Sequence, residues 1–147
     1  MKELTIRDFP EPTLVIRMND RTYREGMSVQ ELGEAVRWCW HLNPEGRVAQ
    51  CHYLLAVYYL EVKEVFEISG TWCRVPDRVE SMEDFGFRYR SFDAENDPGR
   101  TYITQVKVAN DDLRNRYVGK SIAGLIKRGS RCPALILDKL YFDRLGK

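Results

Sequence analysis

The sequence predicts an α+β fold, in the form of a small bent or closed mixed β-barrel with about three short helices. Residues 53–68, YLLAVYYLEVKEVFEI, have the pattern of two consecutive strands at the centre of the fold. Further strand patterns, separated by short helical ones, are spread over the rest of the chain. Because the two central strands are adjacent in sequence, we expect no room for long parallel βαβ units.

The central stretch changes character at Glu61. From Tyr53 to Leu60 every residue is apolar or aromatic, which is typical of a strand covered on both faces. After Glu61 apolar residues alternate with charged ones, which is typical of a half-buried strand. Glu64 breaks this alternation and is expected to point inward. A buried carboxylate needs partners, so we predict that backbone amides or a nearby arginine satisfy it.

The N-terminal part predicts a lead-in and one strand. Pro10 and Pro12 favour an extended lead-in over residues 1–13. Residues 14–18 alternate in the manner of a short strand, and Asn19-Asp20 then turns the chain.

A helix is predicted over residues 29–37. Ser28 and Glu31 form a capping-box pattern at its start, and apolar residues follow at helical spacing. Gly33 is a modest weakness in this helix. Residues 38–46, WCWHLNPEG, contain turn signals and are predicted to form a loop.

The C-terminal half alternates between strand and helix patterns. Strands are expected at residues 85–89, 102–108 and 134–137, and the strongest turn signal lies at residues 93–100. Asn110 can cap a helix that ends near Gly119. Ser121 can cap a second short helix that ends at Gly129.

Composition indicates one ordinary domain over residues 1–147. The chain is 44% hydrophobic and 31% charged, which is typical of a soluble globular protein. No apolar run approaches the roughly 20 residues needed to span a bilayer, and the N-terminus lacks the apolar core of a signal peptide. We therefore expect a cytoplasmic protein without a membrane partner. Cys39, Cys51, Cys73 and Cys132 form no CxxC pair and are interpreted as free, buried thiols.

Motifs for catalysis or metal binding are weak. Gly119-Lys120-Ser121 resembles the end of a phosphate-binding P-loop, but Arg114 stands where that motif needs a glycine. The four side chains of Cys39, His41, Cys51 and His52 match no structural zinc spacing. Nothing indicates a nucleophile paired with either histidine. The sequence therefore predicts no catalytic residue, no metal and no cofactor.

The charge distribution is uneven, although the net charge is only +1. Residues 114–131, called the basic segment below, contain six cations and no acid: Arg114, Arg116, Lys120, Lys127, Arg128 and Arg131. Lys120 and Ser121 would lie beside the amides that open the second predicted helix, where an anion is favoured. The alternative is that these charges are only solvated surface groups.

The aromatic residues suggest a ligand pocket. Trp38, Trp40 and Trp72 all lie near the ends of predicted elements. Together they would line a pocket that stacks a base or another flat ligand. The alternative is that each tryptophan seals one end of the barrel.

Three stretches resemble, in order and spacing, small bacterial domains of the PUA-like superfamily, which includes the EVE, ASCH, YTH and PUA groups. They are IRMNDRTYREGMSVQELGEAVRWCW, YLLAVYYLEVKEVFEI and RYVGKSIAGLIKRGSRCPALI. The resemblance covers about residues 14–137. Glycine is usual in the family soon after the AVY, where this chain has Tyr59-Leu60, and Asn-Pro near the end, where it has Cys132-Pro133.

The resemblance implies a bent barrel that binds RNA or a modified DNA base in an aromatic pocket. Arg17 and Asn19 would read the polar edges of the ligand beside the three tryptophans. The phosphate contacts would be Lys120, Ser121, Lys127, Arg128 and Arg131.

Three functions remain open on these grounds. The first is a non-catalytic nucleic-acid binding module that reads a modified or flipped base. The second is a binder or processor of a small nucleotide-like ligand in the same pocket. The third is a protein-interaction domain.

Overall fold

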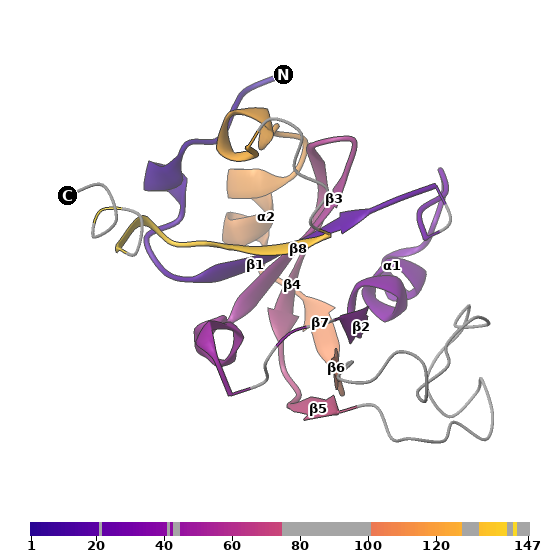
Figure 1. Cartoon of the computed structure of the whole chain (residues 1–147). Helices are drawn as coiled ribbons and strands as arrows, with labels where there is room; N and C mark the ends of the chain where they lie inside the picture. Colours follow the sequence, from indigo (N-terminus) through magenta and orange to yellow (C-terminus); the bar gives the residue numbers. More distant parts are fainter. Residues whose placement is uncertain are drawn as a thin grey trace.

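The computed structural model describes residues 1–20, 22–40, 42, 45–74, 101–127, 133–140 and 143, with the backbone alone at 38–40. A five-stranded mixed sheet with the order β7-β4-β3-β1-β8 forms its centre (Figure 1). Its strands are β1 (Thr13–Met18), β3 (Tyr53–Tyr58), β4 (Glu61–Ile68), β7 (Val106–Val108) and β8 (Ala134–Leu137). The helices are α1 (Val29–Val36) and α2 (Asp111–Tyr117), with short 3-10 turns η1 (Ile6–Asp8), η2 (Arg47–Gln50) and η4 (Ala123–Leu125).

The strand pairing corrects one prediction. β3 and β4 are antiparallel neighbours, as expected of consecutive strands, but β1 pairs with β3 in parallel. The expectation that parallel βαβ units have no room was therefore wrong. That expectation considered only the adjacent central strands, whereas residues 19–52 are long enough for a crossover that carries α1.

A second, three-stranded sheet has the order β2-β6-β5. Its strands are β2 (Trp38–Trp40), β5 (Trp72–Arg74) and β6 (Thr101–Ile103). Residues 38–40, expected in a loop, pair with β6, and the single strand expected at 102–108 divides between the two sheets. Pairing partners distant in sequence decide both cases, and local turn signals do not contain that information.

The α+β class is confirmed, but the barrel closure is not seen. Within the described ranges β7 and β8 form the two edges of the central sheet and do not pair with each other. Each face of the sheet is covered by its own apolar cluster. One contains Leu14, Ile16 and Phe66 with α1 and the small sheet, and the other contains Val15, Leu55 and Val57 with α2, η4 and the N-terminal residues.

Helix α1 begins and packs as its sequence requires. The Ser28 hydroxyl accepts a hydrogen bond from the Glu31 amide, and the Glu31 carboxylate accepts one from the Ser28 amide. The predicted capping box is therefore confirmed. Gly33 lies against the sheet, where a Cβ would come within 3.2 Å of Phe66. The apparent weakness of glycine in this helix therefore allows a close approach between helix and sheet.

Glu64 points inward, as predicted. A bulge in the β3–β4 ladder leaves Lys63 without a register partner, and the Glu64 side chain that follows is buried and bonded to Arg114 of α2. The Glu64 carboxylate accepts the Val65 amide at 3.0 Å and both Nε and Nη2 of Arg114, at 2.8 and 3.2 Å. Helix α2 is capped by the Asn110 side chain and is followed by Gly119 at a φ of 83°, as expected.

Two terminal expectations need revision, and two cannot be compared. The lead-in contains the η1 turn and buries Leu4 and Phe9, so it is more than an extended arm. The helix expected from Ser121 to Gly129 is only the three-residue η4 turn. The strand predicted at 85–89 and the turn at 93–100 lie outside the described residues.

Candidate functional site

A pocket of about 360 Å³ lies where β1 and β3 end. Because these strands are parallel and Met18 pairs with Tyr58, the residues that follow each strand meet at one end of the sheet. Both turns contribute to its lining, and we call it the tyrosine pocket. It is lined by Arg17, Met18, Asn19, Asp20, Val57, Tyr58, Tyr59 and Leu60.

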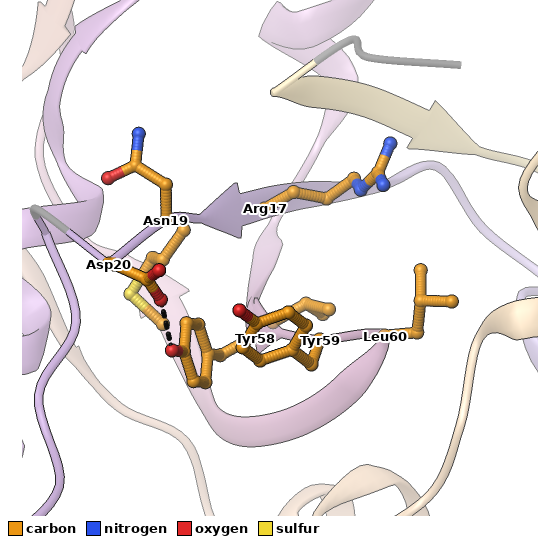
Figure 2. Close-up of a pocket in the computed structure, with 8 residues that line it drawn as sticks. Arg17, Asn19, Asp20, Tyr58, Tyr59 and Leu60 are labelled. Carbon is orange, nitrogen blue, oxygen red and sulfur yellow. Dashed lines mark hydrogen bonds between the residues drawn. The ribbon is translucent and has the colours of Figure 1, made fainter. Parts of the chain in front are cut away.

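Aromatic rings fix one wall of the tyrosine pocket. The Tyr58 ring lies 4.3 Å from the ring of Tyr23 and meets the ring of Tyr59 edge-on at 4.5 Å. The Tyr58 hydroxyl donates a hydrogen bond to a carboxylate oxygen of Asp20 (Figure 2). This bond is the main cause that raises the pKa of Tyr58 above its usual range, so the phenol stays protonated and holds Asp20 in place.

The turn between β3 and β4 has an unusual backbone. Tyr59 and Leu60 have φ angles of 47° and 66°, so this two-residue hairpin has the positive φ values of a type I′ turn. Asn and Gly are the usual residues at these positions, and bulky side chains there cost about 1 kcal/mol each. The Tyr59 side chain is nevertheless 77% exposed, so burial of its ring does not offset this cost. Strain that displays an exposed aromatic ring beside a pocket suggests a binding role.

Arg17 and Asn19, both predicted to contact a ligand, line this pocket. Arg17 is half-buried, and its backbone amide donates to the Pro133 carbonyl at 2.7 Å. The Asn19 side-chain oxygen accepts the Thr22 amide at 3.2 Å, so it helps to form the turn after β1.

The tryptophans lie in the other sheet. β2, which contains Trp38 and Trp40, and β5, which begins at Trp72, flank β6 on its two sides. Trp72 is half-buried and packs against the α1-side core cluster. The five predicted ligand residues therefore divide into two places, and Trp72 does not line the tyrosine pocket.

The predicted phosphate residues also differ in environment. The Lys120 ammonium donates to the Arg116 carbonyl at 2.6 Å, and the Ser121 hydroxyl accepts the Ala123 amide at 3.0 Å. Because η4 has only three residues, the anion site expected at a helix start beside Lys120 is not formed. Lys127 is exposed, while Arg128 and Arg131 lie outside the described residues.

The basic segment reaches the tyrosine pocket through the backbone. Ile122 donates its amide to the Leu60 carbonyl at 2.8 Å, next to the strained turn. Pro133, just beyond the segment, accepts the amide of Arg17. Ile122 and Pro133, which lie on either side of Lys127, Arg128 and Arg131 in sequence, thus each bond to a residue that lines the pocket.

Sequence reasoning missed Asp20, Tyr58 and Tyr59. Asp20 was interpreted only as a turn residue, and the two tyrosines only as part of an apolar run. The available signal was Tyr-Tyr at the end of a strand with no glycine or asparagine in the turn that follows. The parallel pairing that brings this turn to Asp20 had no local signal.

A second hollow of about 380 Å³ lies at the opposite ends of β1 and β3. Its lining carries the acids Glu11 and Asp112 beside the cation Arg116. The mixed charge makes this hollow a poor site for a phosphate chain.

The tyrosine pocket offers polar and aromatic groups that could contact a ligand. Its lining contains one carboxylate, one guanidinium, one amide and two phenols. In the described part of the chain no group of three His, Cys, Asp or Glu side chains could hold a metal ion. No helix there is long and apolar enough to cross a membrane.

Comparisons with protein-family models, with curated proteins and with solved structures find no match to this chain.

Proposed function

We propose that this protein is a non-catalytic nucleic-acid binding module that holds one base, flipped or unpaired, in the tyrosine pocket. The basic segment would contact the phosphates of the same strand. Tyr59 supplies the stacking surface, Arg17 and Asp20 supply polar groups for the base edges, and Lys127, Arg128 and Arg131 supply positive charge. The PUA-like resemblance, with its bent barrel and its RNA or modified-DNA ligand, belongs to this proposal.

One observation carries the proposal: the pocket and the basic segment adjoin. The Ile122–Leu60 hydrogen bond joins the basic segment to the pocket lining, and the Arg17–Pro133 hydrogen bond joins the residues just after the segment to it. A nucleotide presents a flat base and a charged phosphate a few ångströms apart, so a site for one needs both surfaces together. The pocket volume of about 360 Å³ falls at the small end of ligand sites and suits a single base.

The test is a binding titration with Tyr59 variants. Fluorescence anisotropy is measured at low salt with labelled ten-nucleotide RNA and DNA of random sequence, and with unlabelled mononucleotides as competitors. Tyr59→Gly removes the ring and suits the positive φ, so it should fold at least as well as the parent. Base stacking contributes about 1–3 kcal/mol, so the variant should bind roughly tenfold more weakly.

Tyr59→Phe is the matched control, since it keeps the ring and should bind like the parent. If the parent binds neither oligonucleotide, the proposal is wrong. If mononucleotides compete as well as oligonucleotides of equal concentration, the protein is a binder of a small nucleotide-like ligand instead. If Tyr59→Gly binds like the parent, the base does not lie in the tyrosine pocket.

A further inference from the structure

Three oxygen-bearing side chains meet on the α1 side of the tyrosine pocket. Tyr58 packs against the α1-side apolar cluster, and its hydroxyl donates to the Asp20 carboxylate (Figure 2). The Tyr59 ring meets the Tyr58 ring edge-on at 4.5 Å. The bond to Asp20 is the main cause that raises the pKa of Tyr58, and the Tyr59 phenol adds to this rise, so the two hydroxyls lie near each other. A flat group stacked on the exposed Tyr59 ring would therefore extend past its hydroxyl toward Asp20.

The pair of Asp20 and Tyr58 accepts hydrogen bonds and has none left to donate. The phenol has a single O–H group, which is used in the bond to Asp20. An ionised carboxylate has no donor and about four lone-pair positions, of which this bond occupies one. A ligand edge that faces the pair therefore needs an N–H group.

Packing fixes the direction of this acceptor. The Tyr58 ring contacts the ring of Tyr23, with the two centroids 4.3 Å apart, as well as the ring of Tyr59. The Tyr58 hydroxyl is thereby held in place, and it in turn holds one oxygen of the Asp20 carboxylate, which lines the pocket. Tyr58 is thus a positioning residue for Asp20.

The common bases differ in whether they offer an amino group. Adenine, cytosine and guanine each carry an exocyclic amino group with two N–H donors. Uracil and thymine carry carbonyl oxygens instead, and their ring N–H lies between two of them. A carbonyl oxygen that faces a carboxylate leaves both acceptors without a donor, and this disfavours uracil and thymine at such an edge.

We propose that the tyrosine pocket selects bases that carry an exocyclic amino group and discriminates against uracil and thymine. The base would stack on Tyr59 while Asp20 accepts an N–H of its amino group. This inference rests on the proposed nucleic-acid function and adds the class of base that the pocket takes. It makes Asp20 a specificity residue that the sequence did not reveal.

The experiment compares labelled RNA heptamers UUUXUUU that differ only at X, in two matched pairs. Adenine is paired with unsubstituted purine, which keeps the stacking surface and lacks only the amino group, and cytosine is paired with uracil. Fluorescence anisotropy at low salt should show the parent binding the amino member of each pair about tenfold more tightly. Equal affinities within both pairs would overturn the inference and leave the proposed function standing.

Asp20→Asn tests the residue itself. Its side-chain oxygen still accepts from Tyr58, and its amino group then faces the base, so both affinity ratios should fall to about one or below. Ratios that survive in Asp20→Asn would overturn the role of Asp20.

Tyr58→Phe provides a second readout, because it keeps the ring and releases the carboxylate. It should lower both ratios while the melting temperature falls by no more than a few degrees, and unchanged ratios would overturn the positioning role. If the parent binds no heptamer at low salt, the inference and the proposed function are both overturned.

Discussion

At the scale of single residues, the turn beside the tyrosine pocket has a strained backbone that leaves an aromatic ring exposed. Tyr59 and Leu60 adopt a backbone that Asn-Gly would adopt without strain, and the Tyr59 ring remains mostly exposed. Most exposed aromatic residues need no explanation. Here, however, the exposed Tyr59 ring lies on a strained turn, and Asp20 nearby is held by the Tyr58 hydroxyl. The arrangement therefore combines a stacking surface with an oriented hydrogen-bond acceptor.

Cys51 gives a pH-dependent prediction at the same scale. Burial raises the pKa of its thiol from 9.0 to about 12. The unfolded chain therefore releases this proton above about pH 9 while the folded chain keeps it, and stability falls as the pH rises toward 12. Urea unfolding at pH 7.5 and 10.5 should show the parent losing up to about 2 kcal/mol more than Cys51→Ala over this range. An equal loss in both proteins would show that Cys51 does not contribute.

Residues whose role depends on near neighbours in sequence could be predicted. Ser28 and Asn110 cap their helices because a cap involves only the next three residues. The burial of Glu64 was predicted from the alternation around it, but the bulge places Val62 and Phe66 in different apolar clusters, so that alternation does not hold along the whole strand. Asp20 could not be recognised in this way, because its partner Tyr58 is 38 residues away and meets it only through the parallel pairing of β1 and β3.

At the scale of elements, the Glu64–Arg114 pair joins β4 to α2. The carboxylate side chain is 6% exposed and the guanidinium side chain 39%. Removing the acid leaves a cation that water still reaches, whereas removing the cation leaves a buried carboxylate. The two changes should therefore differ in cost.

The prediction is that Glu64→Gln lowers the free energy of unfolding by about 2 kcal/mol and Arg114→Met by about 3 kcal/mol or more. Urea unfolding at pH 7 measures both. Glu67→Gln is a matched control on the same strand, since its partner Lys107 lies 3.7 Å away on the surface, and it should change stability by less than about 1 kcal/mol. Equal effects of the three variants, or loss of nucleic-acid binding in Glu64→Gln at unchanged stability, would contradict this structural role.

Strands and helices with strong local patterns could also be predicted at this scale. The elements α1, β3, β4, α2 and β8 lie where their periodicity and caps indicated. Strand β2 could not be predicted in this way, because its strand character arises from pairing with β6 about 60 residues later. The length of η4 was overestimated. The Ser121 amide donates to the Lys2 carbonyl and the Ser121 carbonyl accepts the Leu4 amide, so these groups do not start a longer helix.

At the scale of the whole molecule, the central sheet brings one end of two parallel strands next to Ile122 and Pro133, which lie on either side of Lys127, Arg128 and Arg131 in sequence. The α1 side and the α2 side of the sheet each have an independent apolar cluster, so the pocket is attached to a frame held from both faces. Sequence patterns indicated the α+β class but not this arrangement, which depends on the parallel crossover. The proposed function requires that the tyrosine pocket and the basic segment bind the same ligand.

The salt dependence of oligonucleotide binding tests this requirement most directly. Affinity for the ten-nucleotide RNA is measured from 50 to 300 mM salt for the parent, for Tyr59→Gly and for Lys127, Arg128 and Arg131 replaced together by Ala. Tyr59→Gly should bind more weakly with the parent's salt slope, and the triple variant should bind more weakly with a slope reduced by about 2. Parent-like affinity and slope in the triple variant, with all proteins folded, would contradict the account.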